Sequence, residues 1–248
     1  MPLGDKGWKE KNGENFVDLG AGSAQSIGMT EGNGKIFAIG DIHGCADKLR
    51  ELIRRLPYEP GRDRLVLLGD YIDRGPDSAG VLELLCALKE RDPKLIALSG
   101  NHEYLLLEYH RTGDPALLPY LRKLGIDATL KSYGVHTGFT LQSLDFLPPT
   151  HRAFLENLLP YWETGDYIFV HAGLEPGLPP AAHDLAGLCE TREGFLSTDH
   201  DFGRRVIFGH TEFELPLVTP TRIGLDTGAV HGNLLTAVEL PGGGFYHA

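Results

Sequence analysis

The sequence predicts an α/β fold in which two mixed β-sheets pack as a sandwich flanked by helices. In the first half of the chain, short and continuously apolar segments alternate with amphipathic helical segments, and short strand-like segments return in the last third. Continuously apolar strands are typical of a sheet that is covered on both faces. The 248 residues contain no segment that resembles a linker, so we expect one domain over residues 34–248.

Three strand–helix units are expected at the beginning of this domain. Apolar segments at residues 36–39, 65–68 and 95–98 each precede a helical segment, and the first two helices carry apolar side chains at i, i+3, i+4 and i+7. The polar, Gly-containing residues 1–33 before them are expected to form a flexible leader. Residues 104–163 are expected to be mostly helical and to form a cap.

The last third of the domain is expected to form the second sheet. Gly and Pro residues separate four strand-like segments, at residues 167–170, 206–208, 222–225 and 234–240. We expect all four segments to lie in one mixed sheet that packs against the first.

Composition argues against several classes of protein. The net charge of -11 disfavours a nucleic-acid scaffold, since proteins that bind a phosphate backbone usually present a basic surface. No apolar run approaches the length of a membrane span, and residues 1–11 lack the apolar core of a secretory signal. We therefore expect a cytoplasmic protein that does not bind membranes. The three cysteines lack metal-binding spacing and are expected to be reduced thiols.

Cys45 is the one cysteine with a candidate role. It follows Gly44 at an expected helix start, where the helix dipole can lower the pKa of a thiol. A redox-sensitive Cys45 is therefore one hypothesis, and a small packing residue is the alternative.

Five short motifs place carboxylates, imidazoles and an amide on loops, four of which directly follow an apolar strand-like segment. They are GDIHG at residues 40–44, GDYIDRG at 69–75, GNHE at 100–103, VHAG at 170–173 and GH at 209–210. Neighbouring parallel strands end at one edge of a sheet, where open α/β sheets place their ligands. Oxygen and imidazole donors suit hard and borderline metal ions, and this set is large enough for two ions.

The candidate ligands divide between the two ions. Asp41 and His43 are two positions apart, so an extended loop can direct both side chains to the first ion. Asp70 can bridge the two ions. The second ion is expected to be completed by Asn101, His171 and His210. We expect two divalent ions, with manganese first and iron or zinc as alternatives, and direct attack of metal-bound hydroxide on a phosphoryl group.

The remaining motif residues have expected roles in catalysis. Arg74 can bind two phosphate oxygens with its guanidinium fork. His102 adjoins a ligand but is poorly placed to be one, so we expect it to be the general acid that protonates the leaving oxygen. Asp73 can accept a hydrogen bond from the other ring nitrogen of His102 and keep that imidazole protonated.

In order and spacing, the five motifs resemble those of the calcineurin-like metallophosphoesterases. They are most similar to the PPP-type serine/threonine protein phosphatases in their compact bacterial form. The resemblance covers residues 35–240 and implies the calcineurin-like metallophosphoesterase fold, a catalytic domain and the same ligand, arginine and acid assignments. It also implies a second phosphate-binding arginine, which Arg192 matches in its Arg-acidic-x-Phe context.

Three further positions follow from the resemblance. Glu212 stands where many members carry the second histidine of Gly-His-x-His, which fits the protein phosphatase branch and disfavours the nucleases. His231 lies on a loop that the family brings near the metals, so we expect it to contact substrate or a ligand. His136, in the expected cap, is another candidate substrate contact.

The leading functional interpretation is hydrolysis of phosphomonoesters, with phosphoserine or phosphothreonine in proteins as the substrate. The alternative is a hydrolase of dinucleoside polyphosphates or nucleotides, because related bacterial enzymes with the same motifs cleave phosphoanhydrides. Both reactions need the same metals, arginines and acid, so residues 104–163 and 174–203 must decide between them. A non-catalytic scaffold is a third interpretation, and it is disfavoured because none of the expected ligands is missing.

Overall fold

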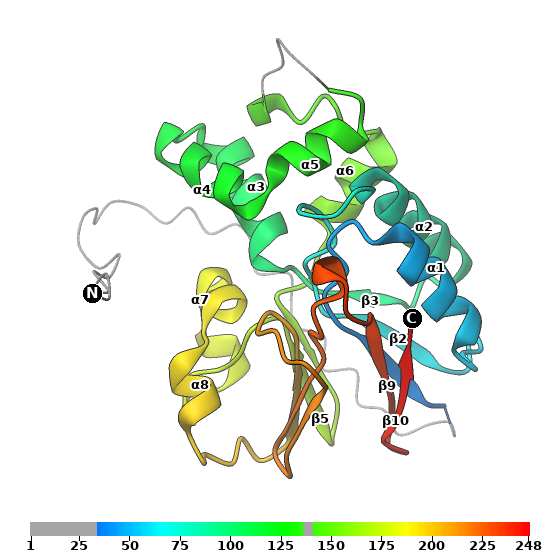
Figure 1. Ribbon diagram of the computed structural model, residues 1–248. Helices are drawn as coiled ribbons and strands as arrows, with labels where there is room; N and C mark the ends of the chain where they lie inside the picture. The colour runs from blue at the N-terminus through cyan, green and yellow to red at the C-terminus, as the bar shows by residue number, and fades with distance from the viewer. Residues whose placement is uncertain (1–33, 136–140) are drawn as a thin grey trace.

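The computed structural model describes residues 34–135 and 141–248, which form two facing five-stranded sheets with helices outside (Figure 1). The predicted leader at residues 1–33 and the candidate His136 lie outside the described residues. The first sheet has the order β10 (Gly244–His247), β9 (Thr236–Leu240), β1 (Ile36–Ile39), β2 (Arg64–Leu67) and β3 (Ile96–Ala97). The second has the order β4 (Tyr161–Glu163), β5 (Tyr167–Val170), β6 (Arg205–Phe208), β8 (Arg222–Gly224) and β7 (Leu217–Val218).

The helices cover the outer faces of both sheets and the edge above them (Figure 1). They are α1 (Ala46–Arg55), α2 (Ser78–Arg91), α3 (Asn101–Thr112), α4 (Leu118–Leu124), α5 (Ile126–Ser132), α6 (Pro149–Glu156), α7 (Leu185–Glu190) and α8 (Glu193–Ser197). Short 3₁₀ segments lie at Pro115–Leu117, Leu141–Ser143, Pro180–Ala182 and Ala229–His231. Between residues 104 and 163, the described residues are mostly helical, although the last three form strand β4, and their role as a cap stays a prediction. None of these helices in the described ranges meets the length and hydropathy that a bilayer crossing demands.

The first sheet is covered on both faces, as its continuously apolar strands predict. In β1, Phe37 and Ile39 pack against the helices. Ala38, between them, faces the second sheet together with Val66 and Phe169. Successive side chains of a strand point to opposite faces, so one apolar strand supplies both cores. A third cluster packs the outer face of the second sheet against α7 and α8.

The predicted placement of residues 234–240 in the second sheet is wrong. β9 pairs antiparallel with β1 in the first sheet, with Ile36 opposite Leu240. Its alternating side chains suit this position, because Ala237 joins the helix-facing core and Val238 the core between the sheets. Alternation specifies which face a side chain occupies and leaves the partner strand open, which is why the pattern could not place this strand.

The parallel order of β1, β2 and β3 brings the loops after these strands to one edge of the first sheet. Backbone hydrogen bonds tie these loops together, since the N–H groups of Ile42 and His43 both donate to the carbonyl oxygen of Asp70, over 3.0 and 2.9 Å. A Cβ at Gly75 would lie 1.9 Å from the carbonyl oxygen of His43, so only glycine permits this close approach. The fold therefore assembles the first three motifs into one site.

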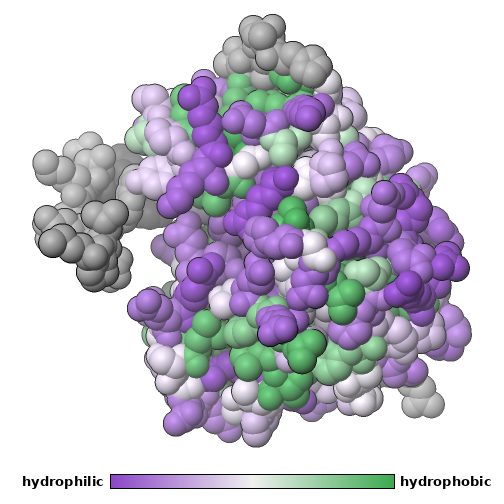
Figure 2. Space-filling model, in the orientation of Figure 1, coloured by the Kyte–Doolittle hydropathy of each residue, from purple (hydrophilic) through white to green (hydrophobic). Residues whose placement is uncertain are grey.

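The face of the molecule seen in Figure 2 is mainly hydrophilic, with hydrophobic residues gathered toward its lower part. Large apolar side chains that remain exposed among the described residues include Leu215 and Val218, in and beside strand β7.

Candidate dinuclear metal centre

The predicted ligand loops hold several non-glycine residues in the left-handed backbone region. Among the described non-glycine residues, φ is positive at His43 (44°), Asp70 (52°), Asp73 (71°), Arg74 (62°), His210 (62°) and Leu144 (56°). All but Leu144 belong to the motifs. This conformation costs about 1–3 kcal/mol per residue and persists where surrounding contacts impose it, most often at functional sites. The fold therefore forces these loops into shapes that their side chains alone would not favour.

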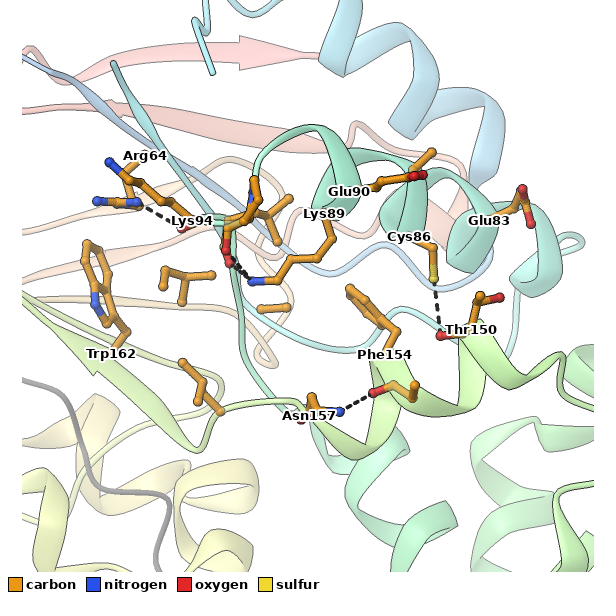
Figure 3. Close-up of a pocket in the computed structure, with 17 residues that line it drawn as sticks. Arg64, Glu83, Cys86, Lys89, Glu90, Lys94, Thr150, Phe154, Asn157 and Trp162 are labelled. Carbon is orange, nitrogen blue, oxygen red and sulfur yellow. Dashed lines mark hydrogen bonds between the residues drawn. The ribbon is translucent and has the colours of Figure 1, made fainter. Parts of the chain in front are cut away.

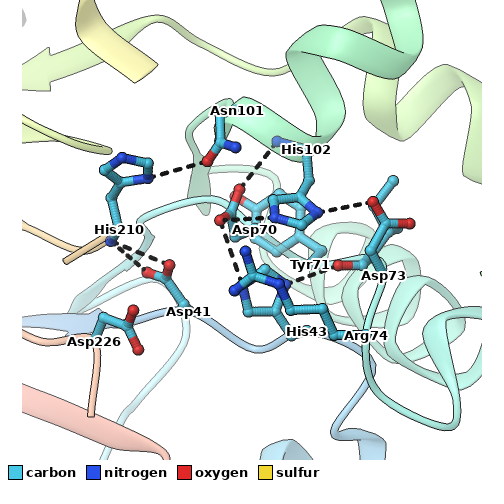
Figure 4. A network of polar contacts seen from close by, with 12 residues as sticks. Asp41, His43, Asp70, Tyr71, Asp73, Arg74, Asn101, His102, His210 and Asp226 are labelled. Carbon is cyan, nitrogen blue, oxygen red and sulfur yellow. Dashed lines mark hydrogen bonds and ion pairs between the residues drawn. The ribbon is translucent and has the colours of Figure 1, made fainter. Parts of the chain in front are cut away.

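Asp70 lies at the centre of the predicted site (Figure 4) and is shared by two groups of side chains that could hold a metal ion. Its Oδ2 atom is 3.4 Å from His43 Nε2 and 3.7 Å from His102 Nε2. Its Oδ1 atom is 3.4 Å from His171 Nε2, in the group that also contains His210. The two oxygens of one carboxylate thus face different groups, which is one arrangement in which a carboxylate can bridge two ions.

Asn101 joins the group of His171 and His210. Its Oδ1 atom lies 3.3 Å from His171 Nε2 and 3.0 Å from His210 Nδ1. Donor atoms that are bound about 2.1 Å from one ion lie about 3.0–3.4 Å from each other. The three side chains are therefore spaced as ligands of one ion would be.

Backbone carbonyls orient two of the imidazoles. His171 Nδ1 donates to the carbonyl oxygen of Leu68 over 2.8 Å. His43 Nδ1 donates to the carbonyl oxygen of Ile72 over 2.9 Å. A donated Nδ1 proton leaves the Nε2 lone pair free, and in both rings that atom faces Asp70. Both histidines are therefore presented as ligands.

Asp41 contacts the backbone of His210 rather than the side chain of His43. Its two carboxylate oxygens accept from the N–H of His210 over 3.0 and 3.1 Å. The Asp41 carboxylate is buried near that of Asp226, and burial together with this like charge raises the pKa of Asp41 well above its usual range. Asp41 belongs to neither of the two groups around Asp70, so its sharing of an ion with His43 stays a prediction.

The electrostatics of the site suit cations. Burial lowers the pKa of His43 and of His210 to about 3, so both rings are neutral and can act as ligands. Burial also disfavours a charged His171, but the carboxylates of Asp70 and Asp41 outweigh it and raise the pKa of His171 to about 10. An ion held by His171 Nε2 would have to displace the proton on that atom, because only the neutral ring offers a lone pair there.

Both predicted phosphate-binding arginines reach the site. Arg74 Nη1 lies 3.0 Å from His43 Nε2. Arg192 Nη2 lies 3.0 Å from His210 Nε2 and 3.4 Å from the carbonyl oxygen of the same residue. Each guanidinium therefore adjoins a histidine of a different group around Asp70, and the Arg74 guanidinium lies where a cation bound to His43 would lie.

His102 and Asp73 form a buried pair beside the centre. His102 Nδ1 lies 2.8 Å from Asp73 Oδ2, and neither side chain is exposed. Burial disfavours a charged His102, but Asp70 and Asp73 outweigh it and raise the pKa of His102. The other ring nitrogen, Nε2, is buried without a hydrogen-bond partner. This orphaned atom and the converging donor set together fit a site built for two divalent ions and an anionic group.

His231 lies at the rim rather than at the centre. Its Nδ1 atom is 2.6 Å from Glu212 Oε2, and 55% of the His231 side chain and 49% of the Glu212 side chain remain exposed. The contact of His231 with substrate or a ligand therefore stays a prediction.

The model of the calcineurin-like phosphoesterase family matches residues 34–212 of the chain. The chain belongs to this family. The asymmetrical bis(5'-nucleosyl)-tetraphosphatase PrpE of a Geobacillus species is 27% identical over 84% of this chain and 91% of its own length. The symmetrical bis(5'-nucleosyl)-tetraphosphatase of Chromohalobacter salexigens is also 27% identical, over 85% of this chain and 96% of its own length. Serine/threonine-protein phosphatase 1 of Salmonella typhimurium is 40% identical over 82 residues, which are 33% of this chain and 36% of that protein.

Solved structures share the fold of this phosphoesterase. The crystal structure of a provisionally assigned diadenosine tetraphosphatase matches 88% of this chain and 95% of its own, with a TM-score of 0.66 at 26% identity. A cold-active protein tyrosine phosphatase of a Shewanella species matches 84% of this chain and 76% of its own, with a TM-score of 0.58 at 17% identity. The predicted fold and family are confirmed, and the chain is a hydrolase of a family that uses divalent metal ions.

Glu103 of this phosphoesterase is a site residue to which the sequence interpretation gave no role. Its buried carboxylate accepts the backbone N–H groups of Asp70 at 3.0 Å, Tyr71 at 2.8 Å and Gly100 at 3.1 Å. Burial raises the pKa of Glu103 to about 7. The side chain ties the loop after β2 to the start of α3. A signal was available, because a glutamate at the third helical position is typical of a helix start.

The hypothesis of a redox-sensitive Cys45 with a lowered thiol pKa is not supported. Cys45 immediately precedes α1, but burial raises the pKa of its thiol. Loss of water around a thiolate outweighs the helix dipole here, so the packing alternative is the better interpretation of Cys45. All three cysteines are free thiols, as predicted.

A separate pocket lies between β3, α2 and α6 (Figure 3). Its walls combine apolar side chains such as Phe154 and Trp162 with the cations Arg64 and Lys94. None of the predicted site residues lines this pocket, so it is distinct from the candidate metal centre.

Proposed function

We propose that this phosphoesterase hydrolyses dinucleoside polyphosphates of the bis(5'-nucleosyl) tetraphosphate type. The main support is the length of chain over which its relatives align. The two tetraphosphatases align with 84% and 85% of the chain, whereas the protein phosphatase aligns with 82 residues. Residues 104–163 and 174–203, which we expect to select the substrate, are together longer than that shorter match, which cannot contain both. The alternative interpretation of the sequence is thus better supported than the leading one.

The proposed metal ligands divide as the motifs suggest. Asp41, His43 and Asp70 would hold one ion, and Asp70, Asn101, His171 and His210 the other. Two such ions polarise phosphoryl oxygens and lower the pKa of water bound between them. Manganese is the ion proposed first, with iron or zinc as alternatives, because mixed oxygen and imidazole ligands suit all three.

The remaining residues bind the phosphate chain and move a proton. Arg74 and Arg192 donate to phosphoryl oxygens, one from each side of Asp70. His102 donates the proton on Nε2 to the oxygen that leaves, while Asp73 holds Nδ1. A nucleoside phosphate leaves as a stable anion and needs less protonation than a serine alkoxide. The contribution of His102 therefore differs between the two substrate classes.

The test compares kcat/KM of the manganese-supplemented enzyme for diadenosine tetraphosphate and for a phosphoserine peptide. We expect the higher value for the dinucleotide. The Asp70→Asn variant, purified in parallel, is the control, since any turnover that it retains comes from contaminating enzymes. A higher value for the peptide would overturn the proposal. Product analysis then separates symmetrical cleavage, into two nucleoside diphosphates, from asymmetrical cleavage, into a triphosphate and a monophosphate.

Phosphoprotein hydrolysis is the second candidate function. It is supported by the 40% identity to the Salmonella protein phosphatase over 82 residues. Glu212, which replaces the second histidine of Gly-His-x-His, also fits this branch. Preference for the peptide in the comparison above would establish this candidate instead.

A further inference from the structure

The turn that carries Asp73 and Arg74 is held by the helical cap. Both residues have left-handed backbone conformations, with φ of 71° and 62°. Such turns persist where neighbouring groups impose them. Here those groups come from α5 and the glycine before it. The N–H of Arg74 donates to the carbonyl oxygen of Gly125 over 3.5 Å, and the N–H of Asp73 donates to Thr129 Oγ1 over 2.8 Å.

Thr129 also contacts the side chain of Asp73, as a hydrogen-bond donor. The Thr129 hydroxyl donates to Asp73 Oδ1 over 2.6 Å, and its oxygen lies 3.0 Å from Ser78 Oγ on α2. A hydroxyl has one proton, so Ser78 must be the donor between the two hydroxyls. All three side chains are fully buried. Removal of the Thr129 hydroxyl therefore leaves a carboxylate oxygen of Asp73 without a donor.

Thr129 and His102 together fix both oxygens of the Asp73 carboxylate. Oδ1 accepts from the Thr129 hydroxyl over 2.6 Å, and Oδ2 accepts from His102 Nδ1 over 2.8 Å. One donor on each oxygen sets the plane of the carboxylate, and that plane sets the direction of the imidazole. The far ring atom, His102 Nε2, is buried without a hydrogen-bond partner beside Asp70.

We propose that Thr129 is a positioning residue for proton transfer, which holds His102 Nε2 in line with the leaving oxygen by fixing the Asp73 carboxylate. The proposal rests on the acid role of His102 within the proposed function. Thr129 lies in the predicted cap and contacts the turn through Asp73. The same segment backs Arg74 through Gly125, and thus supports phosphate binding and proton donation together.

The test uses the full manganese-loaded chain and two substrates that differ in their leaving group, phenyl phosphate and p-nitrophenyl phosphate. Thr129→Val removes the hydroxyl at nearly constant volume, and Thr129→Ser keeps it. Ser132→Ala is the matched control on the same helix, since the Ser132 hydroxyl donates to the Thr129 carbonyl oxygen over 2.8 Å and accepts from Ala79 N–H over 3.1 Å.

Thr129→Val is expected to lower kcat for phenyl phosphate about tenfold, because phenolate leaves poorly without a proton. The KM values, and kcat for p-nitrophenyl phosphate, are expected to stay within about twofold of the wild type. Thr129→Ser and Ser132→Ala are expected to match the wild type on both substrates.

Bound manganese and the thermal midpoint are measured for every variant, and Thr129→Ala replaces the valine variant if that protein does not fold. An equal loss on both substrates, or the same loss in Thr129→Ser, would overturn the positioning role. Aryl phosphate turnover without dinucleotide turnover would overturn the proposed function and leave the Thr129 comparison valid. A wild type that binds two ions and hydrolyses neither aryl ester would overturn both proposals.

Discussion

The first-sheet side and the second-sheet side of the candidate site differ in how firmly the fold holds them. On the first-sheet side, Asp73 and His102 are completely buried, and Glu103 ties Asp70 to the start of α3. On the second-sheet side, His171 is equally buried, but Arg192 is exposed, as Arg74 is on the first-sheet side, and 55% of the His231 side chain is exposed. Preorganised groups save reorganisation during reaction, whereas mobile ones adapt to what binds. We propose that the first-sheet side, backed by Thr129 of the predicted cap, fixes proton transfer, and that the exposed residues of the second-sheet side adapt to the substrate.

The largest loss of activity is expected for substitution of Asp70, whose carboxylate faces both groups of candidate ligands. Asp70→Asn should abolish turnover and reduce bound manganese at both positions, because an amide offers one oxygen where the carboxylate faces both groups. Metal analysis and turnover on p-nitrophenyl phosphate check this. Two ions retained per chain with near-normal turnover would refute the bridging assignment.

The next largest loss of activity is expected for substitution of His102, on the first-sheet side of the site. His102→Asn should lower kcat about 10²–10⁴-fold for phenyl phosphate and much less for p-nitrophenyl phosphate, since only the first leaving group needs a proton. Bound manganese should stay unchanged, because His102 is not a proposed ligand. Equal losses on both esters would count against the general-acid assignment.

Substitution of Arg74 and of Arg192 compares the first-sheet side of the site with the second-sheet side. Arg74→Ala and Arg192→Ala each remove charged hydrogen bonds to phosphate, worth about 1.5–3 kcal/mol, or about 10–100-fold in kcat/KM. Both side chains are exposed, but we expect Arg74→Ala to have the larger effect, since the backbone of Arg74 is held by the carbonyl oxygen of Gly125, whereas Arg192 lies at the start of a five-residue helix. Metal content serves as the control for both variants. A larger loss in Arg192→Ala would reverse the assignment of the rigid and adaptable sides.

The smallest effect is expected at the rim. His231→Gln removes an exposed hydrogen bond with Glu212, and exposed polar contacts of this kind contribute only about 0–1 kcal/mol to stability. Thermal unfolding should therefore change little. If the second-sheet side selects the substrate, KM should change more for diadenosine tetraphosphate than for p-nitrophenyl phosphate. Identical KM values for wild type and variant on both substrates would remove His231 from the substrate-binding surface.

Sequence reasoning succeeded where local pattern and local chemistry coincide. The strands and loops around Asp41, Asp70 and Asn101 were predictable because each motif follows an apolar run, and parallel strands bring such loops to one edge. Arg192 was predictable from its sequence context, and the structure brings its guanidinium to His210.

The parts that escaped prediction depend on distant partners. Thr129 reaches Asp73 from the cap with a single hydroxyl, and an isolated threonine in a helix carries no motif. The partner of β9 was open because alternation specifies only which face is buried. The helix start beside Cys45 was visible in the sequence, whereas the burial that raises the pKa of its thiol was not. In each case the structure depends on a contact between segments that are distant in the sequence, which a local sequence pattern does not reveal.

The pairing of β9 with β1 has a consequence for the order in which the protein is made. β1 emerges from the ribosome early, whereas β9, which covers one edge of it, follows only after almost the whole described chain. Domains made of such distant pairings fold slowly, and an open strand edge invites pairing with other chains. During translation, one edge of β1 therefore has unpaired backbone N–H and C=O groups until residues 236–240 leave the exit tunnel. A stalled or prematurely terminated nascent chain exposes that edge, and is a natural target for chaperones that bind extended segments.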